Sequence, residues 1–164
     1  MDILISVGAS EYGLDRLLKI IDELCDEGLL DGRHIVAQKG SSKYEPKNYK
    51  SFKLIARDEY QTYIDKADVI ISHAGTGSVI PPIKMGKKVI VFPRREQYGE
   101  HLDDHQLELA DVFTKAGFTL CATDKETLKA CITNLNKFKP VVFKSNSENM
   151  NKLVIEYIES LRGI

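Results

Sequence analysis

The stretch ISHAGTGSVIPPIKMGKKVIVFPR, residues 71–94, places a glycine-containing turn between two apolar runs. The two runs, DVIIS (68–72) and KVIVF (88–92), have the continuous apolar character of strands that are buried on both faces of a sheet. Gly75 and Gly77 permit a tight turn after the first run, and a helix is expected to follow that turn. The stretch therefore predicts a strand, a glycine turn, a helix and a second strand of the same sheet.

The rest of the chain alternates short apolar runs with amphipathic stretches, which is the pattern of crossover units in a parallel sheet. Further strands are expected at 3–7, 34–38, 52–55 and 118–121, and helices from Leu14 to about Gly28, at 58–67 with a cap near Asp58, at 101–116 and at 125–135. We predict an α/β fold, a Rossmann-like parallel sheet with helices on both faces, as a single domain over residues 1–164.

A terminal helix is predicted over residues 146–164, because its apolar residues recur at three-and-four spacing. The apolar stripe consists of Met150, Leu153, Val154, Tyr157, Ile158 and Leu161. Either this stripe packs on its own domain, or part of it faces a partner protein.

Composition narrows the functional classes. The 164 residues are 43% hydrophobic, enough for one core, and the 23 basic and 24 acidic residues nearly cancel, which argues against nucleic-acid binding. Three widely spaced cysteines argue against a disulfide framework and favour a reducing, cytoplasmic location. Nowhere do about eighteen apolar residues follow one another, so we expect neither a signal peptide nor a membrane span.

The glycine turn is a candidate anion site. In parallel sheets, ligands collect at the carboxyl ends of the strands, where helix N-termini direct backbone N–H groups outward. Gly75 and Gly77 permit close approach of the backbone to a diphosphate, and Thr76 and Ser78 add hydroxyl donors. A tight turn without a ligand is the alternative. The turn after the first strand, VGASEYG (7–13), matches neither the dinucleotide fingerprint nor the P-loop.

A polar loop, PRREQYGEHLDDHQLELA (93–110), follows the last strand of the opening stretch, and seven of the ten residues from Gln97 to Gln106 carry polar side chains other than tyrosine. Such a loop is suited to contacting sugar hydroxyls. Two alternatives stay open: a solvated helix start capped by Asp103 or Asp104, and a metal site of His101, Asp104 and His105 on one helix face. We expect no metal here.

Several motifs in order resemble a known family. ISHAGTGS, GKKVIVFPR, YGEHLDDHQLELA and the opening ISVG with LDRLL are similar to the C-terminal domain of family 28 glycosyltransferases in its short free-standing form. The resemblance covers roughly residues 1–135. Within this family the sequence is similar to bacterial exopolysaccharide subunits of the PssE type and to the soluble catalytic subunit of the eukaryotic dolichol-linked N-acetylglucosaminyltransferase. It implies one half of a GT-B enzyme that moves a hexose from a UDP-sugar to a lipid-linked acceptor, without a cofactor or a required metal.

The resemblance also assigns roles by position. It implies that the diphosphate lies on the glycine turn, that sugar hydroxyls meet the polar loop, and that the turn after the first strand borders the acceptor side. The residues are Gly75, Thr76, Gly77 and Ser78 for the diphosphate, Glu100, His101, Asp104, His105 and Gln106 for the sugar, and Gly8 and Ala9 for the acceptor side. His73 either orients the turn or touches the donor.

The resemblance implies a partner as well. The acceptor base of GT-B enzymes usually lies on the other half, so we expect a membrane-associated, acceptor-binding glycosyltransferase subunit of the PssD type to recruit this chain to the cytoplasmic face of the membrane. One position departs from the family pattern: Pro81 stands where relatives carry an acidic residue that binds the ribose. This departure keeps two other hypotheses open: a non-catalytic accessory subunit with a degraded nucleotide site, and a metal-dependent hydrolase using the two histidines.

Overall fold

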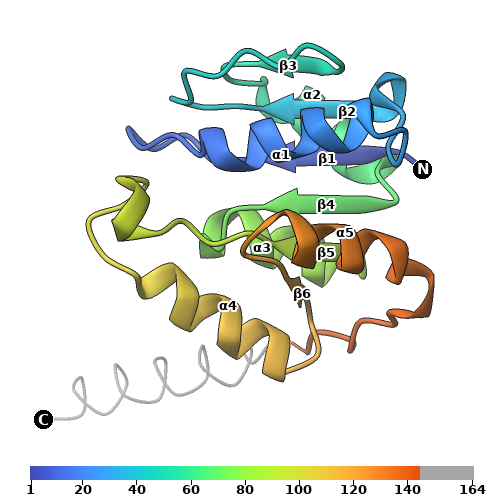
Figure 1. Cartoon of the computed structure of the whole chain (residues 1–164). Coiled ribbons are helices and arrows are strands. Elements are labelled where there is room, and N and C mark those ends of the chain that lie inside the picture. The colour runs from blue at the N-terminus through green and yellow to red at the C-terminus, as the bar shows by residue number, and fades with distance from the viewer. Residues whose placement is uncertain (145–164) are drawn as a thin grey trace, which may run out of the picture.

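A six-stranded parallel sheet forms the centre of the computed structural model, which describes residues 1–144 (Figure 1). The strands are β1 (Ile3–Ser6), β2 (Ile35–Gln38), β3 (Lys50–Phe52), β4 (Val69–Ser72), β5 (Lys88–Val91) and β6 (Leu120–Cys121). Their order is β3-β2-β1-β4-β5-β6, and each neighbouring pair is parallel. The predicted Rossmann-like sheet is confirmed, and its switch point lies between β1 and β4, where ligands bind in such sheets.

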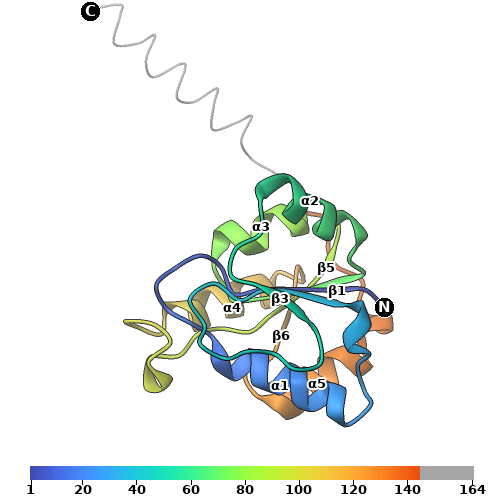
Figure 2. The same ribbon diagram turned by 90° about the horizontal axis from the view of Figure 1, so that it is seen from above.

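Helices cover both faces of the sheet (Figure 2). The α-helices of the described chain are α1 (Asp15–Asp26), α2 (Arg57–Lys66), α3 (Thr76–Lys84), α4 (His105–Lys115) and α5 (Lys125–Thr133), and the short 3₁₀ helices are η1 (Gly32–His34), η2 (Glu96–Tyr98) and η3 (Leu135–Lys137). Helices α1 and α5 pack on one face, and α2, α3 and α4 pack on the other. The predicted terminal helix at 146–164 lies outside the described residues.

Side chains of the central strands alternate between these two layers, as the pleat of a strand requires. Ile3 and Ile5 join the core beneath α1 and α5, whereas Leu4 joins the cluster beneath α2. On the same face as α2, Val89 and Val91 pack against α3 and α4. Both faces of β1 and β4 are buried, which explains the continuous apolar runs that identified these strands in the sequence.

Two element starts differ from the sequence prediction. The third strand was expected at 52–55, but β3 is Lys50–Phe52, because these residues pair with Val36–Gln38. Ile55 lies beyond the strand, where its backbone N–H donates to the Gln38 side chain at 3.0 Å. Helix α2 begins one residue earlier than expected, and its N-cap is Ala56, without a side-chain cap. The expected cap residue Asp58 instead lies in the first turn, where its charge favours the helix dipole.

Two further features affect the candidate site. The helix expected at 101–116 begins only at His105, whose backbone N–H donates to the Asp103 carboxylate at 3.2 Å, so His101 precedes the helix. In α3, Pro81 and Pro82 are the sixth and seventh residues of the helix. At these positions a helix residue normally donates its backbone N–H to the carbonyl oxygen four residues earlier, and proline has no N–H to donate. The helix ends two residues after Pro82.

The polar segment between β2 and β3 is held against α1 by buried Asp22. The Asp22 carboxylate accepts hydrogen bonds from Tyr44 Oη at 2.8 Å and from the backbone N–H groups of Lys47 and Asn48 at 2.8 and 2.9 Å. This contact with the carboxylate raises the pKa of the Tyr44 hydroxyl to about 12. The segment is therefore fixed by a charge-assisted network.

No helix within residues 1–144 combines the length and apolar character that crossing a membrane requires.

Candidate functional site

The carboxyl ends of β1 and β4 lie side by side. Ser6 and Ser72 are paired in the sheet register, and the Ser72 hydroxyl donates to the Ser6 carbonyl oxygen at 3.2 Å. Directly after these residues the chain turns through Gly8 and through Gly75, respectively. The two glycine turns that the sequence singled out therefore meet at the switch point of the sheet, at the left of Figure 1.

The imidazole of His73 fills the space between the two turns. It is 8% exposed, and a Cβ atom on Gly8 would lie 2.7 Å from its Cε1, whereas a Cβ atom on Gly75 would lie 2.3 Å from its Nε2. Gly8 also has a φ of +77°, which side chains rarely adopt. Glycine is thus required at both positions because the ring approaches the two backbones so closely.

His73 is held in its neutral form. Burial, with a further contribution from the nearby charge of Arg94, lowers its pKa from 6.5 to about 4. Nδ1 lies 3.3 Å from the Ser6 carbonyl oxygen, and this bond assigns the proton to Nδ1. Nε2 is then a hydrogen-bond acceptor on the side of the ring that faces Gly75.

The N-terminus of α3 begins beside this ring. Gly75 is the N-cap, and its carbonyl oxygen accepts from Ser78 N at 3.0 Å and Val79 N at 3.1 Å. Within the described chain, the preceding N–H groups of Thr76 and Gly77 have no backbone partner, and both residues are exposed. These free N–H groups and the helix dipole form an environment that favours an anion.

Gly77 differs from the other two glycines because its surroundings are open. A Cβ atom built on it would meet nothing within 4 Å. Its backbone therefore has room for a ligand directly above the first turn of α3. No acidic side chain lies in that turn to compete with an anion.

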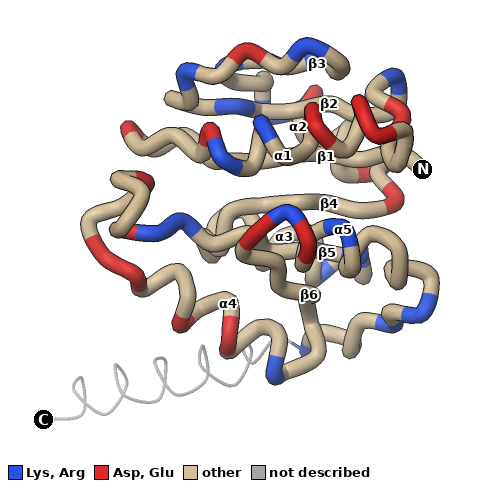
Figure 3. The backbone as a smooth tube through the Cα atoms, viewed as in Figure 1, with Lys and Arg blue, Asp and Glu red and all other residues tan. Residues whose placement is uncertain are grey.

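Arg94, the residue after Pro93, holds the first glycine turn in place. Its side chain is 2% exposed, and its guanidinium donates to the carbonyl oxygens of Val7 at 2.5 Å, Tyr12 at 2.8 Å and Gly13 at 3.4 Å. Burial lowers the pKa of Arg94, and nearby Glu100 opposes that shift. A positive charge is thus buried behind the β1–α1 turn, and Figure 3 shows the basic segment directly after β5.

Glu100 forms a second fixed contact. Its carboxylate accepts two bonds from Arg16 of α1, Nε to Oε1 at 3.0 Å and Nη2 to Oε2 at 2.8 Å, and a third from Arg95 N at 3.0 Å. The side chain is 8% exposed. In this structure the Glu100 carboxylate therefore joins the polar loop to α1, and its predicted contact with a sugar stays a prediction.

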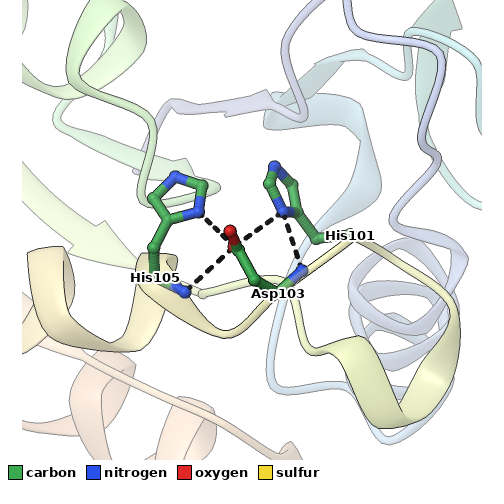
Figure 4. A group of neighbouring side chains, drawn as sticks. All are labelled: His101, Asp103 and His105. Carbon is green, nitrogen blue, oxygen red and sulfur yellow. Dashed lines mark hydrogen bonds and ion pairs between the residues drawn. The ribbon is translucent and has the colours of Figure 1, made fainter.

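The other residues of the polar loop divide into two groups. Gln106 is buried, and its Oε1 accepts from Arg94 N at 3.1 Å, while the Asp104 carboxylate accepts from Glu96 N at 2.9 Å. His101 and His105 instead converge on the carboxylate of Asp103 (Figure 4). The metal alternative was therefore wrong in one ligand: the carboxylate between the histidines belongs to Asp103, not to Asp104, because the helix starts after it.

A pocket of about 600 Å³ opens on the α1 side of these residues. Its lining includes Tyr12, Arg16, Ser41, Tyr98 and Glu100, which come from the β1–α1 turn, α1, the β2–β3 segment and the polar loop. The turn at Gly75–Ser78 is not part of this lining. The candidate site thus consists of an open turn with free N–H groups at the start of α3 and a separate hollow beside α1.

The two glycine turns that the sequence singled out lie together in the structure, but sequence reasoning missed two arginines beside them. Gly8 and Gly75 both lie against the His73 ring, and Thr76, Gly77 and Ser78 follow at the helix start. Ala9 is exposed in the turn after β1. Arg94 and Arg16 were given no role, although a basic residue directly after a buried strand, as in FPRR (92–95), is a signal for a charge at the carboxyl edge.

The neutral state of His73 predicts a pH dependence of stability. Because the pKa is about 4 in the folded chain and 6.5 when unfolded, the unfolded state binds more protons between these values. Stability is therefore fully present above pH 6.5 and is lost as pH falls to 4, by about 3 kcal/mol. Denaturant unfolding at several pH values should show a smaller loss in His73→Gln. Replacing exposed His34 by alanine is the control, and an equal loss in His73→Gln would refute the assignment.

The Arg16–Glu100 pair predicts a shared loss of stability. Glu100→Ala and Arg16→Ala should each lower the free energy of unfolding by about 2–4 kcal/mol, since each leaves a partly buried charge unpaired. The double variant should lose less than the sum. The exposed pair Arg33–Asp31 is the matched control, and Arg33→Ala should cost less than about 1 kcal/mol.

Comparison with known proteins identifies the family. The model of the glycosyltransferase family 28 C-terminal domain matches residues 4–159. The UDP-N-acetylglucosamine transferase subunit ALG13 of Cryptococcus neoformans is 30% identical over 108 residues, which are 65% of this chain and 52% of the relative. The ALG13 subunit of Saccharomyces cerevisiae is 33% identical over 101 residues, which are 58% of this chain and 46% of that relative. The chain thus spans about half the length of these curated relatives.

Solved structures agree on the fold. An ALG13 structure determined by NMR superposes with a TM-score of 0.60 at 19% identity and covers 94% of this chain and 95% of that one. MurG of Acinetobacter baumannii superposes with a TM-score of 0.57 at 21% identity, over 82% of this chain and 41% of MurG. Two glycine turns at the switch point of a Rossmann-like sheet, with a match over residues 4–159, place this chain in the glycosyltransferase family 28 C-terminal domain family.

Proposed function

We propose that this chain is the donor-binding catalytic subunit of a two-component glycosyltransferase that moves a hexose from a UDP-sugar to a lipid-linked acceptor. The observation that carries this proposal is the open N-terminus of α3, where Thr76 and Gly77 present unpaired N–H groups in a chain of a glycosyltransferase family. The relatives are named for UDP-N-acetylglucosamine, so this nucleotide sugar is the first donor to test.

The diphosphate of the donor lies on the first turn of α3 in this proposal. As the glycosidic bond breaks, negative charge develops on the departing nucleoside diphosphate, and the N–H groups and dipole of α3 stabilise it without a required metal. The Thr76 and Ser78 hydroxyls add donors. Neutral His73 keeps the turn in position, and its Nε2 is a hydrogen-bond acceptor for N–H or O–H groups near Gly75.

The sugar extends toward the polar loop. The side chains of His101, Asp104 and His105 are exposed or half-buried and can therefore reach its hydroxyls. Glu100 and Gln106 are buried, and their bonds to Arg16 and to the Arg94 backbone support the loop from behind. Gly8 and Ala9, on the turn beside β1, border the side from which the acceptor approaches. This division of roles accounts for the density of polar groups in one loop.

A partner completes the enzyme. An inverting transfer needs a base near the acceptor hydroxyl, and we assign that base to a membrane-associated, acceptor-binding subunit. That subunit holds the present chain at the cytoplasmic face of the membrane. The naming of the relatives as transferase subunits supports an assembly of this kind.

A non-catalytic accessory role is the second candidate, because of Pro81. This residue is exposed in the second turn of α3, at the position where the family resemblance places an acidic, ribose-binding residue. Proline cannot accept hydrogen bonds from ribose hydroxyls through its side chain. An accessory subunit would stabilise its partner without binding UDP-sugars.

Gly77→Asp tests the diphosphate position. The open space at Gly77 accommodates a side chain without disturbing the fold, but a carboxylate there repels the diphosphate. We expect calorimetry with UDP-N-acetylglucosamine to show binding weakened by about 2 kcal/mol or more, roughly thirtyfold.

Gly77→Asn is the matched control, because it has nearly the same size without the charge and should lose less affinity. Unchanged affinity in a folded Gly77→Asp would place the diphosphate elsewhere. No binding of UDP or UDP-sugars by the unaltered chain, with or without its partner, would favour the accessory role.

The partner requirement predicts the outcome of a reconstitution. Transfer of labelled sugar to a lipid-linked acceptor should occur when the purified chain is added to membranes that contain the acceptor-binding subunit, and should be absent with membranes that lack it. Product is measured in the lipid extract. Full transfer by the purified chain alone would contradict the two-component proposal.

A further inference from the structure

Three side chains, two from the loop between η2 and α4 and one from the first residue of α4, converge on one point (Figure 4). One ligand atom from each of His101, Asp103 and His105 lies within 4.8 Å of the others. His101 Nδ1 is 3.1 Å from Asp103 Oδ1, and His105 Nδ1 contacts the same oxygen. The two imidazole rings meet edge to face at 4.6 Å between centroids.

The hydrogen bonds of this cluster compete with one another. His101 Nδ1 lies 3.4 Å from the backbone N–H of Asp103, for which it must be an acceptor, and also faces the Asp103 carboxylate, for which it must be a donor. One imidazole nitrogen cannot do both. If both rings carry the proton on Nδ1, three N–H groups address the single oxygen Oδ1, because His105 N also donates to it at 3.2 Å.

A cation between the three side chains resolves this competition. Neutral imidazoles direct their Nδ1 lone pairs at the ion, and the carboxylate contributes an anionic oxygen. Two imidazole nitrogens and one carboxylate oxygen are a ligand set for zinc and similar divalent transition metals. Magnesium and calcium instead prefer oxygen ligands throughout.

The position of the cluster supports access and a structural effect. Asp103 and His105 are exposed, so an ion reaches them from solvent, and the ring of His101 lies against that of Tyr12 with 5.5 Å between centroids. An ion here would join the first residue of α4 to the loop before it, and through His101 to the β1–α1 turn. The cluster is thus at the edge of the candidate site, not at the α3 N-terminus.

We propose that His101, Asp103 and His105 form a binding site for a divalent transition metal of the zinc class. Three protein ligands leave one coordination position for water, as in zinc sites that are open to solvent. The ion fixes the η2–α4 loop against the β1–α1 turn. His101 and His105 are also the side chains that the proposed function places near the sugar, but the test measures metal binding alone, so its failure would not count against that function.

Calorimetric titration tests the site. The full chain, freed of any histidine tag and stripped with a chelator, is titrated with Zn²⁺ in a buffer that does not bind metal. We expect one equivalent to bind to the unaltered chain, and at least a tenfold weaker affinity in His101→Ala, in His105→Ala and in Asp103→Asn. His34→Ala is the matched control, because His34 forms an exposed pair with Asp2 elsewhere on the surface and should bind normally.

Two further measurements distinguish the proposal from nonspecific binding. Co²⁺ should give the visible absorption of a low-symmetry, nitrogen-ligated ion, and the signal should disappear in the double variant His101→Ala/His105→Ala. Zn²⁺ should raise the Tm of the unaltered chain but not that of the double variant. No Zn²⁺ binding, or equal Zn²⁺ affinity in the unaltered chain and the folded double variant, would overturn the proposal.

Discussion

The buried guanidinium of Arg94 fixes the end of β5 to the turn after β1, and the arrangement of the carboxyl edge depends on this contact. Three backbone carbonyl oxygens, from Val7, Tyr12 and Gly13, accept its hydrogen bonds. A charge that is 2% exposed is costly unless its donors are satisfied, so the loop and the arginine determine each other's position. A lysine would carry the charge but could not reach three carbonyl oxygens with the same planar geometry.

On this support, His73 determines how closely the two glycine turns approach. Its ring occupies the volume that side chains at Gly8 and Gly75 would need. Since burial and the charge of Arg94 keep the ring neutral, the positive potential at the turn comes from the backbone N–H groups of α3 and from Arg94. These are fixed groups whose charge does not change near neutral pH.

The sequence predicted the architecture well, because the apolar runs of β1, β4 and β5 are long enough to indicate burial on both faces. It also located the glycine turns, because they directly follow these apolar runs. It could not predict that Glu100 pairs with Arg16 or Gln106 with Arg94, because these contacts join residues 84 and 12 positions apart through the fold. The start of α4 was placed too early, because the helix begins where the Asp103 carboxylate accepts the backbone N–H of His105 and not where the spacing of apolar residues begins. The glycosyltransferase family was predicted from several motifs in order, because a single glycine turn does not identify a family.

Helix α1 carries contacts to two loops at once. Asp15 accepts from Lys43 N at 2.9 Å, and Asp22 holds Lys47 and Asn48, so the β2–β3 segment is attached to one side of the helix. Arg16 attaches the polar loop through Glu100. A displacement of α1 would therefore carry both loops with it as one rigid body. A molecule that presses on one of these loops therefore also acts, through α1, on the other loop.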